Sequence, residues 1–112
     1  MQKEKEKRKF QRWIKKLIVV YSTLEGIKVE ELTVTENISL GGLQVTLIYK
    51  LEKDEPVETK IEFINDPIPV DASCKVCYSY PERGKFRTGL EFIKMEDFHN
   101  ERLLRYLEKE GI

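Results

Sequence analysis

The stretch Leu43–Tyr49, which reads LQVTLIY, decides the fold because an apolar side chain recurs at every second position. In a β-strand, successive side chains point to opposite faces of the sheet. We therefore expect Leu43, Val45, Leu47 and Tyr49 to share one face of a strand and to lie against a core.

Five further segments around this strand have the same period of two or a β-branched, apolar composition. Short stretches containing Gly, Asn, Asp or Pro separate them and are typical of turns. The expected strands are Ile14–Tyr21, Ile27–Thr35, Val57–Ile64, Ile68–Tyr80 and Lys85–Ile93. Short turns favour antiparallel pairing, and closure of the sheet removes exposed edges. The sequence therefore predicts a mainly β fold, a six-stranded antiparallel barrel.

The alternation also predicts which side chains of the later strands share the core face. In the strand that begins at Val57, these are Val57, Thr59, Ile61 and Phe63. In the strand that begins at Ile68, these are Ile68, Val70, Ala72, Cys74, Val76 and Tyr78. Each set is expected to line the interior of the barrel.

The C-terminal segment has a helical pattern instead. Asp97 suits the N-cap, Glu101 lies in the first turn, and Gly111 suits the position after the last turn. Apolar residues lie roughly along one helical stripe: Phe98, Leu103, Leu104 and Leu107. We expect one helix, from about Asp97 to Glu110, packed on the barrel.

Charge is unevenly distributed along a chain whose formal net charge is zero. Residues 1–16 contain eight basic and two acidic side chains, a formal charge of +6, so the other 96 residues carry −6. We expect residues 1–12 to form a flexible basic arm and residues 13–112 to form the barrel with its helix. Such an arm either binds an anionic ligand or only increases solubility, and charge alone does not distinguish the two.

The N-terminal region does not resemble a signal peptide, because no apolar run of the required length follows the basic residues. The longest apolar stretch, Leu17–Tyr21, is far too short to span a membrane. We therefore expect a cytoplasmic protein, a monomer or a homodimer, in which Cys74 and Cys77 are reduced.

The sequence gives little support for catalysis or for a metal site. The single histidine, His99, occupies a polar position early in the expected helix, where we expect a solvated side chain. Cys74 and Cys77 have CxxC spacing, but residues three apart in a strand point to opposite faces. Two such thiols do not readily share a metal, and no second pair completes four ligands. We expect Cys74 in the core and no enzyme activity, cofactor or metal.

Two short motifs stand out from this background. Arg8 and Arg12 form RxxxR in the basic arm, and Asn37, Ser39 and Gly42 form NxSxxG where the strand pattern breaks. Each motif is weak alone, because RxxxR occurs by chance in basic segments and NxSxxG fits an ordinary turn. They occur in this order with 24 residues between them, enough for two strands. The combination is more specific than either motif.

In this combination the sequence resembles the PilZ domain, the bacterial receptor module for cyclic di-GMP. The family's pattern is RxxxR followed, after roughly two strands, by [D/N]xSxxG, and the stretch NISLGGL at 37–43 is similar to its usual form. Thr88–Phe92 (TGLEF) resembles the family's late strand before the C-terminal helix. The resemblance covers residues 8–107. It implies a split-barrel receptor that binds cyclic di-GMP without chemistry and signals to a protein partner.

The polar side chains of both motifs suit this ligand. The guanidinium groups of Arg8 and Arg12 are planar forks for phosphate oxygens or for guanine O6 and N7. Asn37 offers a donor and an acceptor to a guanine edge, and Ser39 adds a hydroxyl. The family more commonly has Asp at the position of Asn37, but its pattern admits both.

The remaining candidates are glycines and aromatic residues. Gly41 and Gly42 allow backbone amides to approach a ligand closely. Phe10 and Trp13 are candidates for a lid or for stacking on a base, and Trp13 alternatively covers the barrel mouth. The alternative for the polar residues of the turn is that they bond only their own backbone.

Two other functions are consistent with parts of the sequence. A PilZ-like adaptor would bind proteins and no nucleotide, although both motifs are intact here. A single-stranded nucleic-acid binder would use the basic arm and its aromatic residues, but the acidic body disfavours a long polyanion. We therefore expect no DNA or RNA partner. Neither the protein partner nor the number of cyclic di-GMP molecules follows from the sequence.

Overall fold

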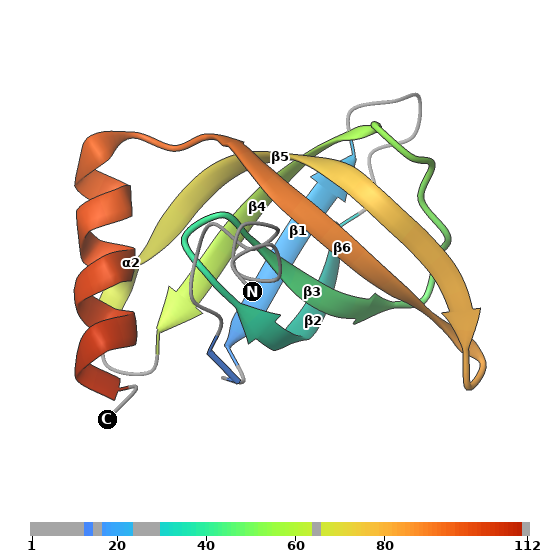
Figure 1. Ribbon diagram of the computed structural model, residues 1–112, viewed down its shortest axis with the longest axis horizontal. Coiled ribbons are helices and arrows are strands. Elements are labelled where there is room, and N and C mark those ends of the chain that lie inside the picture. Colours follow the sequence, from blue (N-terminus) through green and yellow to red (C-terminus); the bar gives the residue numbers. More distant parts are fainter. Residues whose placement is uncertain (1–12, 15–16, 24–29, 64–65, 111–112) are drawn as a thin grey trace, which may run out of the picture.

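The computed structural model describes residues 13–14, 17–23, 30–63 and 66–110, which form a closed barrel of six antiparallel strands and one helix (Figure 1). The elements are β1 Ile18–Thr23, β2 Glu30–Ile38, β3 Gly42–Leu47, β4 Pro56–Phe63, β5 Asp66–Glu82, β6 Lys85–Lys94 and α2 Asp97–Glu110. Around the barrel, the strand order is β1-β2-β3-β6-β5-β4. The predicted mainly β, six-stranded antiparallel fold with a C-terminal helix is confirmed.

β1 closes the barrel because it has a hydrogen-bonded neighbour on each side. Val19 lies opposite Thr33 of β2 and also opposite Ile61 of β4. On the far side, β6 lies between β3 and β5 and pairs with both. Among the described residues, each of the six strands therefore has a paired neighbour on both sides, as expected of a closed barrel.

β3 and β4 show the alternation expected from the sequence. In β4, the side chains at alternate positions are buried: Val57, Thr59, Ile61 and Phe63. In β3, Leu43, Val45 and Leu47 are at most 3% exposed. Tyr49, predicted on the same face, is instead 56% exposed. The prediction is wrong because β3 ends at Leu47, after which the chain leaves the sheet and the period of two no longer applies.

β5 is the longest strand, and its alternation changes phase at a β-bulge. Alternate residues from Val70 to Val76 are buried as predicted, including Cys74. The pairing with β6 then shifts register between Val76 and Tyr78, which moves the following side chains to the opposite face. Tyr78, predicted in the core, is therefore exposed on the outside. Ile68 is also exposed, contrary to the prediction, because it lies where the pairing of β4 with β5 is irregular.

Two strand boundaries near the NxSxxG motif differ from the prediction. The expected strand Ile14–Tyr21 begins at Ile18, and β2 continues to Ile38 instead of ending at Thr35. A register irregularity between Thr35 and Asn37 accompanies this extension of β2. The first residue of the motif therefore belongs to a strand, and the turn itself is shorter than the motif.

The helix α2 packs at one end of the barrel against β5 (Figure 1). Leu103 and Leu107 are fully buried, and Tyr106 stacks on Phe63 with ring centroids 4.2 Å apart. Phe98, predicted on the same stripe, is 58% exposed. It lies five positions from Leu103, which is about 140° around a helix of 3.6 residues per turn, so the two side chains cannot share a face.

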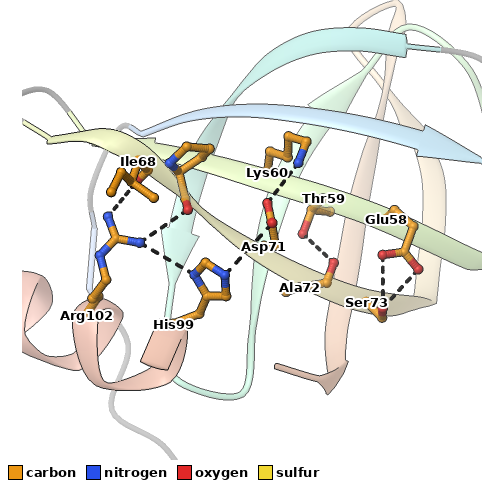
Figure 2. A network of polar contacts seen from close by, with 10 residues as sticks. Glu58, Thr59, Lys60, Ile68, Asp71, Ala72, Ser73, His99 and Arg102 are labelled. Atoms are coloured by element: carbon orange, nitrogen blue, oxygen red, sulfur yellow. Dashed lines mark hydrogen bonds and ion pairs between the residues drawn. The ribbon is translucent and has the colours of Figure 1, made fainter. Parts of the chain in front are cut away.

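Arg102 attaches α2 to the beginning of β5, as Figure 2 shows. Its side chain is only 9% exposed. The guanidinium donates to Asp66 Oδ2 at 2.6 Å, to the Pro69 carbonyl at 3.2 Å and to the Ile68 carbonyl. Bonds that involve a charged partner contribute about 1.5–3 kcal/mol each, so this one side chain makes a strong local attachment.

Candidate ligand-binding site at the turn between β2 and β3

The NxSxxG motif forms a tight turn between the end of β2 and the start of β3. The Ser39 N–H donates to the Gly42 carbonyl at 2.8 Å, which closes the turn. The Ser39 hydroxyl accepts from the Gly41 N–H at 3.0 Å and lies 3.4 Å from the Gly42 carbonyl, to which it donates. Ser39 is 5% exposed. Its side chain therefore stabilises the turn, which was the alternative left open by the sequence.

Gly42 has a packing role that does not require a ligand. A Cβ atom at this position would lie 2.2 Å from the Leu90 carbonyl oxygen and 3.1 Å from the Glu91 Cα. Both atoms belong to the backbone of β6, so a side chain has no room without displacing the strand. Glycine here allows β3 and β6 to approach, and the prediction that it serves backbone contact with a ligand stays a prediction.

The strand β6 also holds the turn directly. The Phe92 N–H donates to the Gly41 carbonyl at 2.9 Å. The stretch Thr88–Phe92 therefore lies against the NxSxxG turn, although some fifty residues separate the two in the sequence. This contact gives a physical reason for the two patterns to occur together in one chain.

Trp13 connects the beginning of the described chain to the same turn. It forms an isolated antiparallel bridge with Ile38, with N···O distances of 2.7 and 2.9 Å. The Trp13 side chain is partly buried and packs against the core, which supports a covering role. Arg8, Phe10 and Arg12, the candidate residues of the arm, lie outside the described residues.

A row of polar side chains runs from Asn37 across the outer face of the barrel. Asn37 Nδ2 donates to Gln44 Oε1 at 2.7 Å, and Gln44 Nε2 donates to the Tyr78 hydroxyl at 2.8 Å. The Tyr78 ring stacks on the Tyr80 ring with centroids 5.7 Å apart. Sequence reasoning missed Gln44 and Tyr78 as members of the site. Gln44 lies opposite Asn37 in the pairing of β2 with β3, so a prediction of the register of these two strands would have identified Gln44.

The cation nearest to this row along β6, Arg87, is already paired. It bonds Glu82 through Nε at 2.6 Å and Nη2 at 2.9 Å. This two-bond contact raises the pKa of Arg87 and lowers the pKa of Glu82, because each charge stabilises the other. An anionic ligand at this face therefore gains little from Arg87.

The two cysteines behave as the strand geometry predicts. Cys74 is buried and Cys77 is exposed, on opposite faces of β5. Burial raises the pKa of the Cys74 thiol to about 12 and also raises the pKa of the Cys77 thiol. Neither thiol has the lowered pKa of a reactive cysteine. Among the described residues, no group of three or more His, Cys, Asp or Glu side chains is arranged to hold a metal ion.

His99 does not have the solvated side chain expected from the sequence. Its side chain is 13% exposed, because α2 packs this position against β5. His99 Nε2 lies 3.9 Å from Asp71 Oδ2, and Nδ1 lies 3.5 Å from Arg102 Nη1 (Figure 2). Asp71 in turn accepts from Lys60 Nζ at 3.0 Å. His99 is therefore part of the polar contact between the helix and the barrel.

Two shallow hollows, of about 210 and 200 Å³, lie near this contact and not at the NxSxxG turn. The first is lined by Glu58, Asp71, Glu96, Lys94 and His99 among others, and the second by Glu58, Lys60 and Asp71 among others. In both hollows the carboxylates outnumber the lysines, which disfavours a ligand that carries phosphates. The turn between β2 and β3 remains the better candidate for such a ligand.

The comparison with protein families assigns residues 6–109 to the PilZ domain. Inhibitor of motility (MotI/DgrA) from Bacillus subtilis has a similar fold, with a TM-score of 0.77 and 21% identity over 92% of this chain and 50% of that chain. The PilZ domain with c-di-GMP of YcgR from Escherichia coli gives a TM-score of 0.71 and 13% identity over 92% of each chain. This chain thus spans half the length of MotI/DgrA.

The PilZ domain of CeSA from a cellulose-synthesizing bacterium gives a TM-score of 0.67 and 20% identity over 88% of this chain and 98% of that chain. No curated protein matches the chain. The described part of the chain contains no helix of the length and apolar character that crossing a membrane requires.

Proposed function

Since the chain belongs to the PilZ domain family, we propose that it is a receptor for cyclic di-GMP, the ligand typical of the family. The observation that supports this most directly is the bridge between Trp13 and Ile38. Trp13 follows Arg12 directly in the sequence, and it pairs with Ile38, which lies inside the NxSxxG motif. This pairing supports the proposal that the two motifs serve one site.

Each motif has a distinct chemical role in the proposed complex. Arg8 and Arg12 form bidentate bonds to phosphate oxygens or to guanine O6 and N7. Asn37 bonds a guanine edge through its amide. The turn formed by Ser39, Gly41 and Gly42 holds Asn37 in position and brings backbone atoms close to the ligand. No step of bond making or breaking is involved, so the protein is proposed as a receptor without enzyme activity.

The free energy of ordering the arm makes ligand binding a switch. Fixing the five residues from Arg8 to Arg12 costs roughly 5–10 kcal/mol of backbone entropy. Hydrogen bonds to charged groups return about 1.5–3 kcal/mol each, so about four such bonds are needed to offset the cost. We propose that residues 1–12 are a flexible arm that folds onto the barrel (residues 13–112) only with ligand.

The changed surface would then be recognised by a protein partner in the cytoplasm. MotI/DgrA is described as an inhibitor of motility, and CeSA comes from a cellulose-synthesizing bacterium. Control of motility, biofilm formation or polysaccharide production is therefore the proposed output. The protein acts as a monomer or a homodimer, with no nucleic-acid partner.

Calorimetric titration of the protein with cyclic di-GMP tests this proposal, with cyclic di-AMP and GTP as controls. Selective heat with cyclic di-GMP is the expected result. Equal binding of all three nucleotides contradicts a specific receptor.

A second candidate function, a protein adaptor without nucleotide binding, has one observation in its favour. Ser39 and Gly42 both have structural roles in the turn that require no ligand. Absence of heat with all three nucleotides would favour this adaptor over the receptor.

A further inference from the structure

We propose that Gln44 is a positioning residue that fixes the amide of Asn37 in the orientation needed to recognise the ligand, and that Tyr78 in turn fixes Gln44. The inference rests on the proposed binding of cyclic di-GMP and adds two residues that neither motif contains. It concerns the row Asn37–Gln44–Tyr78 on the outer face of the barrel.

The first contact in the row uses the cross-strand geometry of β2 and β3. Asn37 and Gln44 are direct partners in the antiparallel pairing, so their side chains leave the sheet side by side. Asn37 Nδ2 donates to Gln44 Oε1 at 2.7 Å, a short bond for two neutral amides. When an amide nitrogen is hydrogen-bonded to a neighbour, the amide group resists a rotation of 180°. Such a rotation would exchange the positions of its donor nitrogen and its acceptor oxygen.

The second contact anchors Gln44 itself. Gln44 Nε2 donates to the Tyr78 hydroxyl at 2.8 Å. Tyr78 reaches this position because the bulge in β5 turns it outward and because Gly89 leaves room for its ring. A Cβ atom at Gly89 would lie only 2.4 Å from the Tyr78 ring. The ring therefore passes over Gly89 of β6, and its hydroxyl reaches the side chain of Gln44 on β3.

The direction of the hydrogen bonds from Asn37 to Gln44 and from Gln44 to Tyr78 determines which atom of the Asn37 amide can contact a ligand. The bond to Gln44 engages Nδ2, so the orientation of the amide places Oδ1 at its other end. An amide oxygen has two lone pairs and so can accept a bond from a ligand N–H in addition to any bond within the protein. The Watson–Crick edge of guanine carries N–H donors at N1 and N2, whereas adenine has an acceptor at N1. A fixed acceptor therefore favours guanine over adenine.

Three single substitutions test the row by calorimetry with cyclic di-GMP. Gln44→Met keeps the length of the side chain and removes both hydrogen bonds, and we expect roughly a 3- to 10-fold loss of affinity, the usual effect of a lost hydrogen bond. Tyr78→Phe removes only the hydroxyl and should lower affinity in the same direction by a smaller factor. Tyr80→Phe removes a hydroxyl from the neighbouring stacked ring and serves as the matched control, with affinity within twofold of the wild type.

A double-mutant cycle separates direct pairing from a general effect on the surface. The cycle combines Gln44→Met with Tyr78→Phe, because Gln44 Nε2 donates to the Tyr78 hydroxyl. Gln44→Met already removes this hydrogen bond, so Tyr78→Phe has nothing further to remove from the row. The double variant should therefore bind about as well as Gln44→Met alone, and the two single effects should not add.

The outcomes distinguish this inference from the proposed function. If the wild type does not bind cyclic di-GMP, the receptor proposal fails and the inference fails with it. If the wild type binds but Gln44→Met binds within twofold of it, or the double-mutant cycle is additive, only the role of Gln44 is overturned. Thermal unfolding of every variant without ligand checks that the barrel is intact, and Gln44→Ala, which also removes both hydrogen bonds, provides a second variant if Gln44→Met does not fold.

Discussion

Gly42 illustrates how the absence of one side chain determines the distance between two strands. The Leu90 carbonyl of β6 occupies the space that a Cβ atom would need, at 2.2 Å. A glycine in a ligand-binding motif is usually explained by the close approach that it allows between the backbone and the ligand. Here the backbone contact between β3 and β6 is sufficient reason for glycine, whether or not a ligand is bound.

We predict that Gly42→Ala destabilises the protein even when no ligand is present. The new methyl group must push β6 away or strain the turn, and overpacking of this kind costs about 1–3 kcal/mol. Urea unfolding of the two proteins without nucleotide measures the difference. A variant with unchanged stability but weakened ligand binding would show that the glycine serves the ligand and not the packing.

At the scale of elements, the attachment of α2 depends on a few polar contacts beside an apolar stripe. Arg102 donates to Asp66 and to two carbonyl groups of β5, while Leu103 and Leu107 bury the apolar side of the helix. The bond from Arg102, followed by the Ile68 N–H, lowers the pKa of Asp66 below its usual value. The ionised form of Asp66 therefore stabilises the folded protein.

This lowered pKa predicts how the stability of the protein depends on pH. A carboxyl group with a lower pKa in the folded protein contributes fully above its unfolded value of about 3.9, and its contribution is lost as the pH falls through the folded value. We expect Asp66→Asn to be less stable than the wild type near pH 7 and the difference to shrink as the pH falls below about 4.

Urea unfolding between pH 7 and pH 2 measures this dependence. Glu62→Gln, which removes an exposed carboxylate from β4, controls for the loss of one charge. A difference between Asp66→Asn and the wild type that stayed constant over the whole pH range would contradict the role of the ionised carboxylate.

The sequence predicted the elements well wherever the period of two continued without interruption. β4 has its buried side chains where the alternation places them, and α2 has the predicted bounds, Asp97–Glu110. The predicted N-cap is wrong by one residue, because the Asn100 N–H donates to the Glu96 carbonyl and Asp97 is already helical. The errors in the strands occur where the backbone departs from regular geometry. A bulge exposes Tyr78, the end of β3 exposes Tyr49, and the pairing of β4 with β5 exposes Ile68. Propensity and alternation carry no information on these register shifts.

The candidate site was predictable only in part, for a related reason. The NxSxxG pattern identified Asn37 and the turn, because a turn of this kind needs particular residues at fixed spacing. Gln44 and Tyr78 join the row through cross-strand pairing and a bulge, which bring together residues 34 positions apart. A contact of that separation follows from the register of the barrel and not from local sequence.

At the scale of the whole molecule, charge divides the chain into two parts of opposite sign. The first 16 residues carry a formal charge of +6 and the remaining 96 carry −6. A segment with a formal charge of +6 is attracted to an anionic ligand and also, less specifically, to the acidic remainder of the chain. The specific contribution of the two arginines therefore has to be separated from the general contribution of the positive charge.

We predict that Arg8→Ala and Arg12→Ala each lower the affinity for cyclic di-GMP at least about 100-fold, because each removes two bonds to charged or polar acceptors worth about 1.5–3 kcal/mol apiece. Lys7→Ala and Lys9→Ala remove the same charge from the same arm but no planar fork, so each should cost only a few-fold in affinity. Calorimetric titration of the four variants measures these effects. Equal losses for the arginine and lysine variants would mean that the arm acts through net charge alone.

The closed barrel also determines how the chain must fold. β1 meets β4 through partners such as Ile18 and Glu62, and β3 meets β6 through partners such as Gly42 and Glu91. Each of these pairings joins positions more than forty residues apart, so long loops must close before the hydrogen bonds that offset their entropy can form. A protein with this contact order is expected to fold in milliseconds to seconds and not in microseconds. The closed strand order of the described residues, which gives each strand two neighbours in the native state, therefore leaves strand edges exposed during folding until these long-range pairings form.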